Sequence, residues 1–208
     1  MLQRTDEWRQ IRCGKVTASR LADVMAEPTK KKKDDGTTEA TTRRNYRREL
    51  ALERLYGHPQ ESGYTSFAMQ QGIEREAEAR ENYKLKRRLP VEEVGFVVHP
   101  GIPDSGSSPD GLVGSDGVLE IKSPEANAMW EMLTKHAVER KYVYQVQWAL
   151  ACTGRRWADI VFYRTGCPLE IIRLDRDDLT ISELETAVRA FSAEVDADAE
   201  LVRKRQQW

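Results

Sequence analysis

The chain has 208 residues, of which 39% are hydrophobic and 32% are charged, and its formal net charge is −1. This balance predicts a single soluble domain over residues 1–208, and no apolar run is long enough to cross a bilayer. No signal-peptide pattern follows Met1, so we expect a cytoplasmic protein. Cys13, Cys152 and Cys167 lack the spacing of a metal site and are expected to be reduced. The near-neutral charge neither predicts nor excludes a nucleic-acid partner, because an acidic exterior can offset a basic groove.

Two short helices are expected near the start of the chain, over residues 6–12 and 18–25. Thr17 can cap the second helix, whose first turn would offer free backbone N–H groups and a positive dipole end. Such a helix end binds phosphate readily, and Arg12 and Ser19 are close enough in sequence to contribute. Ordinary capping beside a surface arginine explains the same residues.

Residues 27–42 are polar and lack apolar periodicity, which predicts a mobile loop. The lysine run at residues 30–33 is either simply solvated or a source of sequence-independent phosphate contacts. Longer helices are expected over residues 43–56 and 66–89. Glu76, in the second of these, follows the apolar positions at a spacing that can turn it inward, although most helix glutamates face solvent.

The most informative stretch is a candidate hairpin. A strand is expected over residues 91–99, then a loop rich in glycine, proline and serine over residues 100–111, and then a strand over residues 118–123. Alternate residues of a strand share a face, so Glu120 and Lys122 should point the same way.

The hairpin loop decides whether Asp110 joins this pair. A two-residue loop would place Asp110 on the opposite face from Glu120 and Lys122. A three-residue loop over residues 115–117, closed by a glycine in the left-handed region, instead pairs Leu112 with Glu120. It also pairs Asp110 with Lys122, so all three charged residues share a face, and we favour this register.

Two carboxylates beside a lysine can hold a hard divalent cation. Mg²⁺ prefers oxygen ligands and keeps several waters, so Asp110, Glu120 and the backbone carbonyl of Ile121 would suffice. Lys122 would then orient or deprotonate a water for attack on phosphorus. The alternative is an ordinary surface hairpin with a Glu-x-Lys pair, and the Ser-Pro-Asp-Gly sequence ten residues upstream favours the metal site.

The remaining elements complete an α/β pattern. Gln145 and Gln147 cannot share one face of their helix, so only one of them can point to the candidate metal site. Taken together, the order of elements predicts an α/β fold with a mixed central sheet flanked by helices. The expected elements are helices over 125–139 and 142–152, a second hairpin over 157–163 and 169–174, and an amphipathic helix over 177–204.

Several motifs occur in an order that resembles the PD-(D/E)xK nuclease superfamily and, more narrowly, the phage lambda exonuclease family of YqaJ-like viral recombinases. The resemblance runs from Trp8 to Gln147. It rests on Trp8-x-x-x-Arg12-x-Gly14-x-x-Thr17-Ala18-Ser19, Gly72-x-x-x-Glu76-x-x-Ala79-Arg80, Ser108-Pro109-Asp110-Gly111, Glu120-Ile121-Lys122 and Gln145-Val146-Gln147.

This resemblance implies roles for particular residues. Arg12 and Ser19 would contact the 5′-phosphate of DNA. Glu76 would be an accessory acid at the metal site, and Gln145 would sit beside Lys122 and help to position water. The implied fold is restriction-endonuclease-like.

The resemblance also implies a function. The protein would be a Mg²⁺-dependent exonuclease, with one or two ions and Mn²⁺ as a substitute, that digests one strand of double-stranded DNA from a 5′-phosphorylated end in the 5′-to-3′ direction. It would act as a ring-shaped homotrimer, phage- or prophage-encoded in a bacterial host, and leave a 3′ overhang for a single-strand annealing protein. Two alternatives stay open: a structure- or site-specific endonuclease of the same superfamily, and a non-catalytic DNA-end binding recombination protein.

Overall fold

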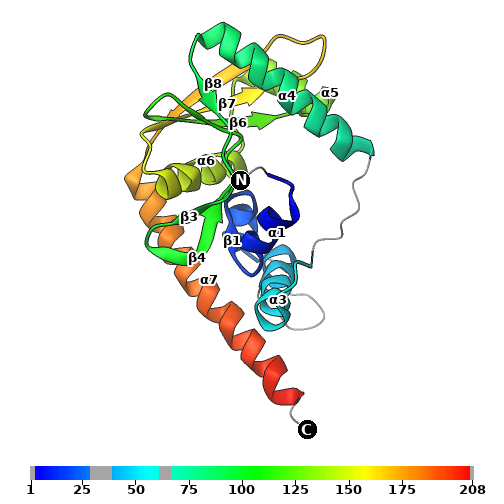
Figure 1. Cartoon of the computed structure of the whole chain (residues 1–208), viewed down its shortest axis with the longest axis vertical. Helices are drawn as coiled ribbons and strands as arrows, with labels where there is room; N and C mark the ends of the chain where they lie inside the picture. The colour runs from blue at the N-terminus through cyan, green and yellow to red at the C-terminus, as the bar shows by residue number, and fades with distance from the viewer. Residues whose placement is uncertain (1–2, 29–38, 61–66, 207–208) are drawn as a thin grey trace.

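The computed structural model describes residues 3–28, 39–60 and 67–206, and its strands form two sheets (Figure 1). The larger sheet has the strand order β2 (Val91–Glu92), β5 (Gly111–Val113), β6 (Gly117–Lys122), β7 (Trp157–Phe162) and β8 (Glu170–Asp175). The smaller sheet has the order β1 (Val16–Thr17), β4 (Ile102–Ser107) and β3 (Val97–His99). Pairs β6/β7 and β1/β4 are parallel and the others antiparallel, so both sheets are mixed. The predicted mixed α/β class is confirmed, with the sheet in two parts.

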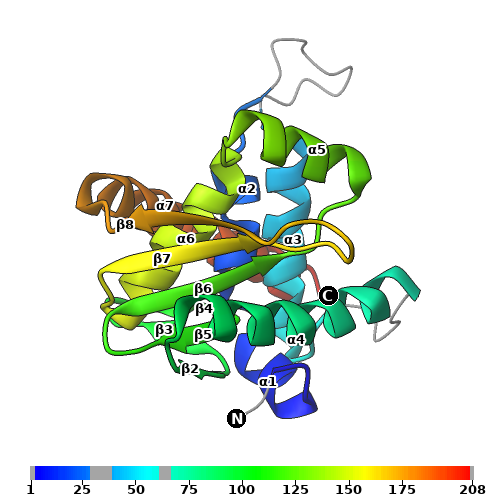
Figure 2. The ribbon, with the colours of Figure 1, turned by 90° about the horizontal axis from the view of Figure 1, so that it is seen from above.

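Seven α-helices and a 3₁₀ turn lie around and between the sheets in the described part of the chain. They are α1 (Asp6–Arg12), η1 (Ala18–Arg20), α2 (Leu21–Val24), α3 (Thr41–Tyr56), α4 (Phe67–Arg87), α5 (Ala126–Lys135), α6 (Arg140–Thr153) and α7 (Asp178–Arg205). Helix α6 packs on one face of the larger sheet and α4 on the other (Figure 2). None of these helices is both long and apolar enough to cross a membrane.

Helix α6 is the central element of the core. Val146 and Leu150 pack against the larger sheet, whereas Tyr144 and Trp148 lie in a separate cluster with η1, α2, α3 and α7. A helix that is apolar on both sides is buried on both sides, which fixes its orientation. The polar side chain that α6 directs at β6, Gln145, is therefore held on a rigid element.

Strand β6 is also buried on both faces, and its alternation sorts its side chains. Leu119 and Ile121 join the cluster under α4, whereas Val118 joins the cluster under α6. Because alternate strand residues share a face, Glu120 and Lys122 point to the α6 side with Val118. The strand thus delivers its two charged residues to the helix that carries Gln145.

The hairpin between β5 and β6 turns through three residues, 114–116, because Val113 pairs with Gly117. The predicted loop over residues 115–117 is wrong by one position. Gly114, with φ +51°, is the loop residue in the left-handed region, and Gly117 instead begins β6.

The predicted pairs Leu112 with Glu120 and Asp110 with Lys122 are wrong by two positions, since Leu112 pairs with Val118. Continued past the end of β5, this register brings Asp110 opposite Glu120. A shift of two positions preserves the alternation of faces, so the reason for grouping the three charged residues still holds.

One predicted element near the small sheet is wrong and two are confirmed only in part. The strand expected over residues 91–99 is interrupted, and its two ends, β2 and β3, belong to different sheets. The loop expected over residues 100–111 contains β4, whose small polar residues hide the alternation typical of a strand. A Cβ on Gly106 would lie 2.4 Å from the Phe96 ring, so glycine is needed for this strand to pass beneath it. The helix expected over residues 18–25 is only η1 followed by the four-residue α2, and Thr17 makes no side-chain cap. Thr17 instead belongs to β1.

Most of the predicted mobile loop over residues 27–42, including residues 30–33, lies outside the described residues. Its last two residues, 41–42, begin α3. The expectation of a single domain over the whole chain stays a prediction.

Gly117 is expected to be the most sensitive glycine of the larger sheet. A Cβ at this position would lie 2.2 Å from the Trp157 ring, so Gly117→Ala must displace the indole and should lower the free energy of unfolding by roughly 1–3 kcal/mol. Gly72→Ala, in α4 with nothing within 4 Å of the added atom, is the matched control and should be neutral or stabilising. Urea unfolding of both variants checks the prediction, and an unchanged midpoint for Gly117→Ala would contradict it.

Candidate active site

Glu120, Lys122 and Gln145 form a closed set of hydrogen bonds between β6 and α6. The Lys122 ammonium donates to Glu120 Oε1 at 2.8 Å and to Gln145 Oε1 at 2.9 Å. Gln145 Nε2 donates to the same Glu120 oxygen at 2.6 Å. Gln147 points elsewhere: its amide bonds to the backbone of Asp175 and Asp177. The structure therefore places the predicted glutamine, and not its neighbour, beside the lysine.

Asp110 completes the carboxylate pair from the end of the loop before β5. Its Oδ2 accepts a hydrogen bond of 2.6 Å from the backbone N–H of Ile121. Burial, together with the negative charges of Glu120 and Glu76, raises the pKa of Asp110 well above its usual range, although the Ile121 N–H and the Lys122 ammonium oppose this shift. Negative charge is thus concentrated here beyond what the lysine neutralises, as at a cation site.

One carboxylate oxygen gives a direct test of whether the site suits a metal. Glu120 is 3% exposed, and its Oε2 is buried without a hydrogen-bond partner among the described residues. An unpartnered buried carboxylate oxygen is costly, and a cation would satisfy it. The N–H and C=O groups of one strand residue point to the same side of the strand. The Ile121 N–H bonds to Asp110, so the Ile121 carbonyl is directed toward Asp110 as well.

The donor set suits Mg²⁺ better than a metal that needs an all-protein cage. The described residues contain no group of three or more His, Cys, Asp and Glu side chains placed to hold a metal ion. Two carboxylates and a carbonyl are enough for Mg²⁺, which keeps several of its waters. The residues present, Asp110, Glu120 and Ile121, therefore fit the predicted ion.

Lys122 is held in its charged form. Burial by itself would lower the pKa of Lys122, but the charge of Glu120 and its hydrogen bond outweigh burial and raise the pKa. The ammonium also lies 4.9 Å from the centre of the Tyr142 ring. The geometry favours a role for Lys122 as a hydrogen-bond donor over a role as a base.

Glu76 lies near the pair but is engaged by two guanidinium groups. Arg80, one turn later on α4, donates to Glu76 Oε1 at 2.7 Å, and Arg4 forms an ion pair with Oε2. The Arg80 side chain is 9% exposed, whereas that of Arg4 is 42% exposed. With Asp110 and Glu93 these residues line a cavity of about 180 Å³. The role of Glu76 as an accessory acid stays a prediction.

Residues 108–110 are held by three side chains that the sequence did not single out for this task. Trp8 Nε1 donates to the serine hydroxyl at 2.9 Å, Gln3 Nε2 to the proline carbonyl at 2.8 Å, and Arg80 Nε to the Asp110 carbonyl at 3.2 Å. Trp8 and Arg80 do stand in the quoted motifs, but nothing in the spacing indicates these long-range contacts. Three anchors on three consecutive residues fix the backbone that carries Asp110.

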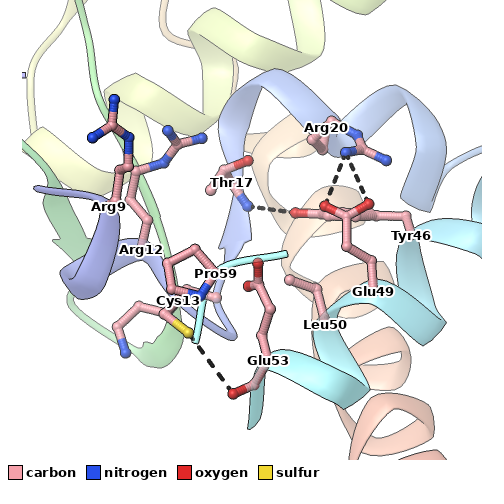
Figure 3. Close-up of a pocket in the computed structure, with 11 residues that line it drawn as sticks. Arg9, Arg12, Cys13, Thr17, Arg20, Tyr46, Glu49, Leu50, Glu53 and Pro59 are labelled. Atoms are coloured by element: carbon pink, nitrogen blue, oxygen red, sulfur yellow. Dashed lines mark hydrogen bonds and ion pairs between the residues drawn. The ribbon is translucent and has the colours of Figure 1, made fainter. Parts of the chain in front are cut away.

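Arg12 lies over the face of the Trp8 indole, with its guanidinium carbon 4.0 Å from the ring centre. Its side chain lies next to that of Arg9, and both line a small pocket of about 30 Å³ (Figure 3). Arg20, also in this pocket, is paired with Asp23 and Glu49. The basic side chains of the pocket are Arg9, Arg12, Lys15 and Arg20.

Ser19 is exposed and is not among the described residues that line this pocket. Its hydroxyl lies 3.4 Å from that of Thr17, which does line the pocket. The argument from a helix dipole fails here, because η1 and α2 are too short and Thr17 caps neither. Any phosphate bound here would rely on side chains, chiefly on the arginine fork of Arg12.

Comparisons with known proteins agree with this arrangement. A family model described as the YqaJ-like viral recombinase domain matches residues 7–156. The chain is similar to two crystal structures of LHK-Exo, an alkaline exonuclease from Laribacter hongkongensis, with 40% identity over 98% of both chains in each case. The TM-score is 0.86 for the structure in complex with dAMP and 0.85 for the other. A phage-related exonuclease from Haemophilus somnus 129PT is 17% identical over 92% of this chain and 96% of that chain, with a TM-score of 0.64, which supports the fold alone. No curated protein matches the sequence.

Proposed function

The chain belongs to the family of YqaJ-like viral recombinase domains, and from that premise we propose that it is a phage-type exonuclease acting on double-stranded DNA. The observation that carries the proposal is the pairing of Asp110 with Glu120 beside a charged Lys122, because the buried Oε2 of Glu120 has no hydrogen-bond partner in the described part of the chain. The 40% identity to an alkaline exonuclease over nearly the whole chain supports the same reaction class.

Mg²⁺, as one or two ions or with Mn²⁺ in its place, would be held by Asp110, Glu120 and the Ile121 carbonyl. When bound, the ion would neutralise the negative charge that develops on the scissile phosphate. Asp110 and Glu120 contribute by their placement: the backbone N–H of Ile121 fixes one carboxylate, and Lys122 with Gln145 fixes the other.

Lys122 and Gln145 would orient the attacking water. An ammonium has three N–H donors, and two of those of Lys122 are directed at Glu120 and Gln145. The third is left to hold the water or a phosphate oxygen in line with the P–O bond that breaks. Positioning of this kind, on side chains fixed by one another, is the main contribution that a protein makes to phosphoryl transfer.

The finer parts of the proposal rest on family membership. The enzyme would digest one strand 5′ to 3′ from a 5′-phosphorylated end as a ring-shaped homotrimer, and leave a 3′ overhang for a single-strand annealing protein. It would do so in the cytoplasm of a bacterial host, as a phage or prophage product. Glu76 would act as an accessory acid once Arg4 releases one of its oxygens.

A linear duplex and a relaxed covalently closed circle of the same sequence test this function. With Mg²⁺ we expect nucleotides to be released from the linear duplex and the circle to stay intact. Cutting of the circle would identify an endonuclease instead. Binding of linear DNA without any Mg²⁺-dependent release would identify a non-catalytic DNA-end binding protein.

Arg12→Ala is expected to erase most of the preference for a 5′-phosphate. Each step of 5′-to-3′ digestion that frees a 5′-mononucleotide leaves a new 5′-phosphate, which is the group the Arg12 fork would hold. Loss of a charge-assisted bond worth roughly 1.5–3 kcal/mol should slow digestion of phosphorylated ends by about ten- to a hundredfold, and of 5′-hydroxyl ends much less.

The measurement is the initial rate on both substrates at fixed salt, since backbone contacts are salt-sensitive. Arg203→Ala, in the last turn of α7, is the control and should change neither rate. If Arg12→Ala keeps the full preference, the phosphate pocket lies elsewhere.

A further inference from the structure

We propose that Trp8 is a positioning residue that couples binding of the DNA 5′ end to the position of the loop that carries Asp110. The inference rests on the proposed function, because it names how the Arg12 pocket acts on the metal site. Trp8 itself need touch neither the metal nor the reacting phosphate.

Two contacts of Trp8 carry the inference, and they use different parts of one rigid side chain. The face of the indole supports Arg12, whose guanidinium carbon lies 4.0 Å from the ring centre. The indole N–H, in the ring plane, donates to Ser108 Oγ at 2.9 Å. Because the ring is flat and stiff, the position of the guanidinium and the direction of the N–H depend on each other.

The acceptor, Ser108, is two residues before Asp110 in a segment whose next two residues are themselves anchored. Gln3 holds the carbonyl of Pro109, and Arg80 holds the carbonyl of Asp110. Neither Gln3 nor Arg80 is among the described residues that line the Arg12 pocket. Among these three anchors, Trp8 is the one that also contacts the candidate phosphate-binding residue.

The consequence is a coupling between two binding events. A phosphate that orders Arg12 also orders the indole, and the indole then fixes the loop that brings Asp110 opposite Glu120. A phosphorylated end would therefore raise kcat as well as affinity. Coupling of this kind is reciprocal for binding, so an ordered Asp110 loop would also favour binding of the phosphate. A hydroxyl end would leave Arg12, and through it the loop, less ordered.

Three variants separate the two contacts. Trp8→Phe keeps an aromatic face for Arg12 but removes the N–H, and Ser108→Ala removes the acceptor from the other side. Trp8→Leu removes both the face and the N–H. Activity is measured as kcat on 5′-phosphorylated and 5′-hydroxyl duplexes, and binding as fluorescence anisotropy of both duplexes in EDTA.

We expect Trp8→Phe and Ser108→Ala each to lower kcat on phosphorylated ends by about three- to tenfold, the range of one neutral hydrogen bond, and to change kcat on hydroxyl ends much less. The double variant should lose no more than either single variant, because both remove the same bond. Binding in EDTA should be nearly unchanged for Trp8→Phe and weakened for Trp8→Leu.

Equal slowing on both ends, or additive losses in the double variant, would overturn the coupling and leave Trp8 as a packing residue. A wild-type protein that binds the phosphorylated duplex no better than the hydroxyl duplex would overturn the proposed end recognition, and the coupling with it. Binding in EDTA does not depend on hydrolysis, so the two failures are distinguishable.

Discussion

Asp110→Asn is expected to abolish Mg²⁺-dependent hydrolysis of duplex DNA while leaving the protein folded and slightly more stable without the metal. The substitution removes a candidate ligand but keeps an oxygen near the Ile121 N–H. Loss of a metal ligand that supplies several kcal/mol should lower the rate by at least about a thousandfold. Asp104→Asn, at an exposed position of β4, is the matched control and should retain activity.

The stability part of this prediction follows from the sign of the pKa shift. Burial and the charges of Glu120 and Glu76 raise the pKa of Asp110 in the folded state. Such a carboxyl stabilises the fold below its ordinary pKa of about 3.9, and that contribution is lost as the pH rises through the raised value. At neutral pH the charged form therefore costs stability, and the neutral Asn does not.

Melting temperatures in EDTA at neutral pH check this result. The Asn variant should melt at or above the temperature of the wild type, and Mg²⁺ should stabilise it less than it stabilises the wild type. Activity that returns to near wild-type rates in excess Mg²⁺ would show that Asp110 is peripheral to the site.

Lys122→Met should lose turnover by about a hundredfold or more, since it removes the donor that positions water or phosphate, yet it should still bind the metal. Without the ammonium, Glu120 is a buried carboxylate whose remaining partner among the described residues is the Gln145 amide. Such a charge is destabilising, and a cation relieves it.

The measurements are kcat and the rise in melting temperature on addition of Mg²⁺. The metal-free Lys122→Met protein should melt below the wild type, and Mg²⁺ should raise its melting temperature more than that of the wild type. Loss of the Mg²⁺ response would mean that the roles of Lys122 and the carboxylates are assigned wrongly.

Local alternation was enough to predict that Asp110, Glu120 and Lys122 meet at this site. Glu120 and Lys122 share a face because a strand alternates, and Asp110 stayed grouped with them because the error in the hairpin register was an even number of residues. The choice between Gln145 and Gln147 came from the family resemblance, since helical spacing showed only that one of them faces away.

What the sequence could not show depends on contacts between distant segments. Strand β4 consists mostly of small and polar residues, so it shows no apolar alternation. One of them, Gly106, must be small because the strand passes beneath the Phe96 ring. Thr17 reads as a helix cap, but β1 pairs with β4 across many intervening residues. The hydrogen bond from Trp8 to Ser108 also joins distant parts of the chain, so local spacing gives no signal for it.

Digestion of one duplex labelled at either end of the same strand tests the central claim most directly. With Mg²⁺ and a 5′-phosphorylated strand, we expect the 5′ label to appear at once as mononucleotide and the 3′ label to remain in long DNA until late, with no release of either label in EDTA. Immediate release of the 3′ label, internal cuts, or release that continues unchanged in EDTA would contradict a metal-dependent 5′-to-3′ exonuclease built on Asp110, Glu120 and Lys122.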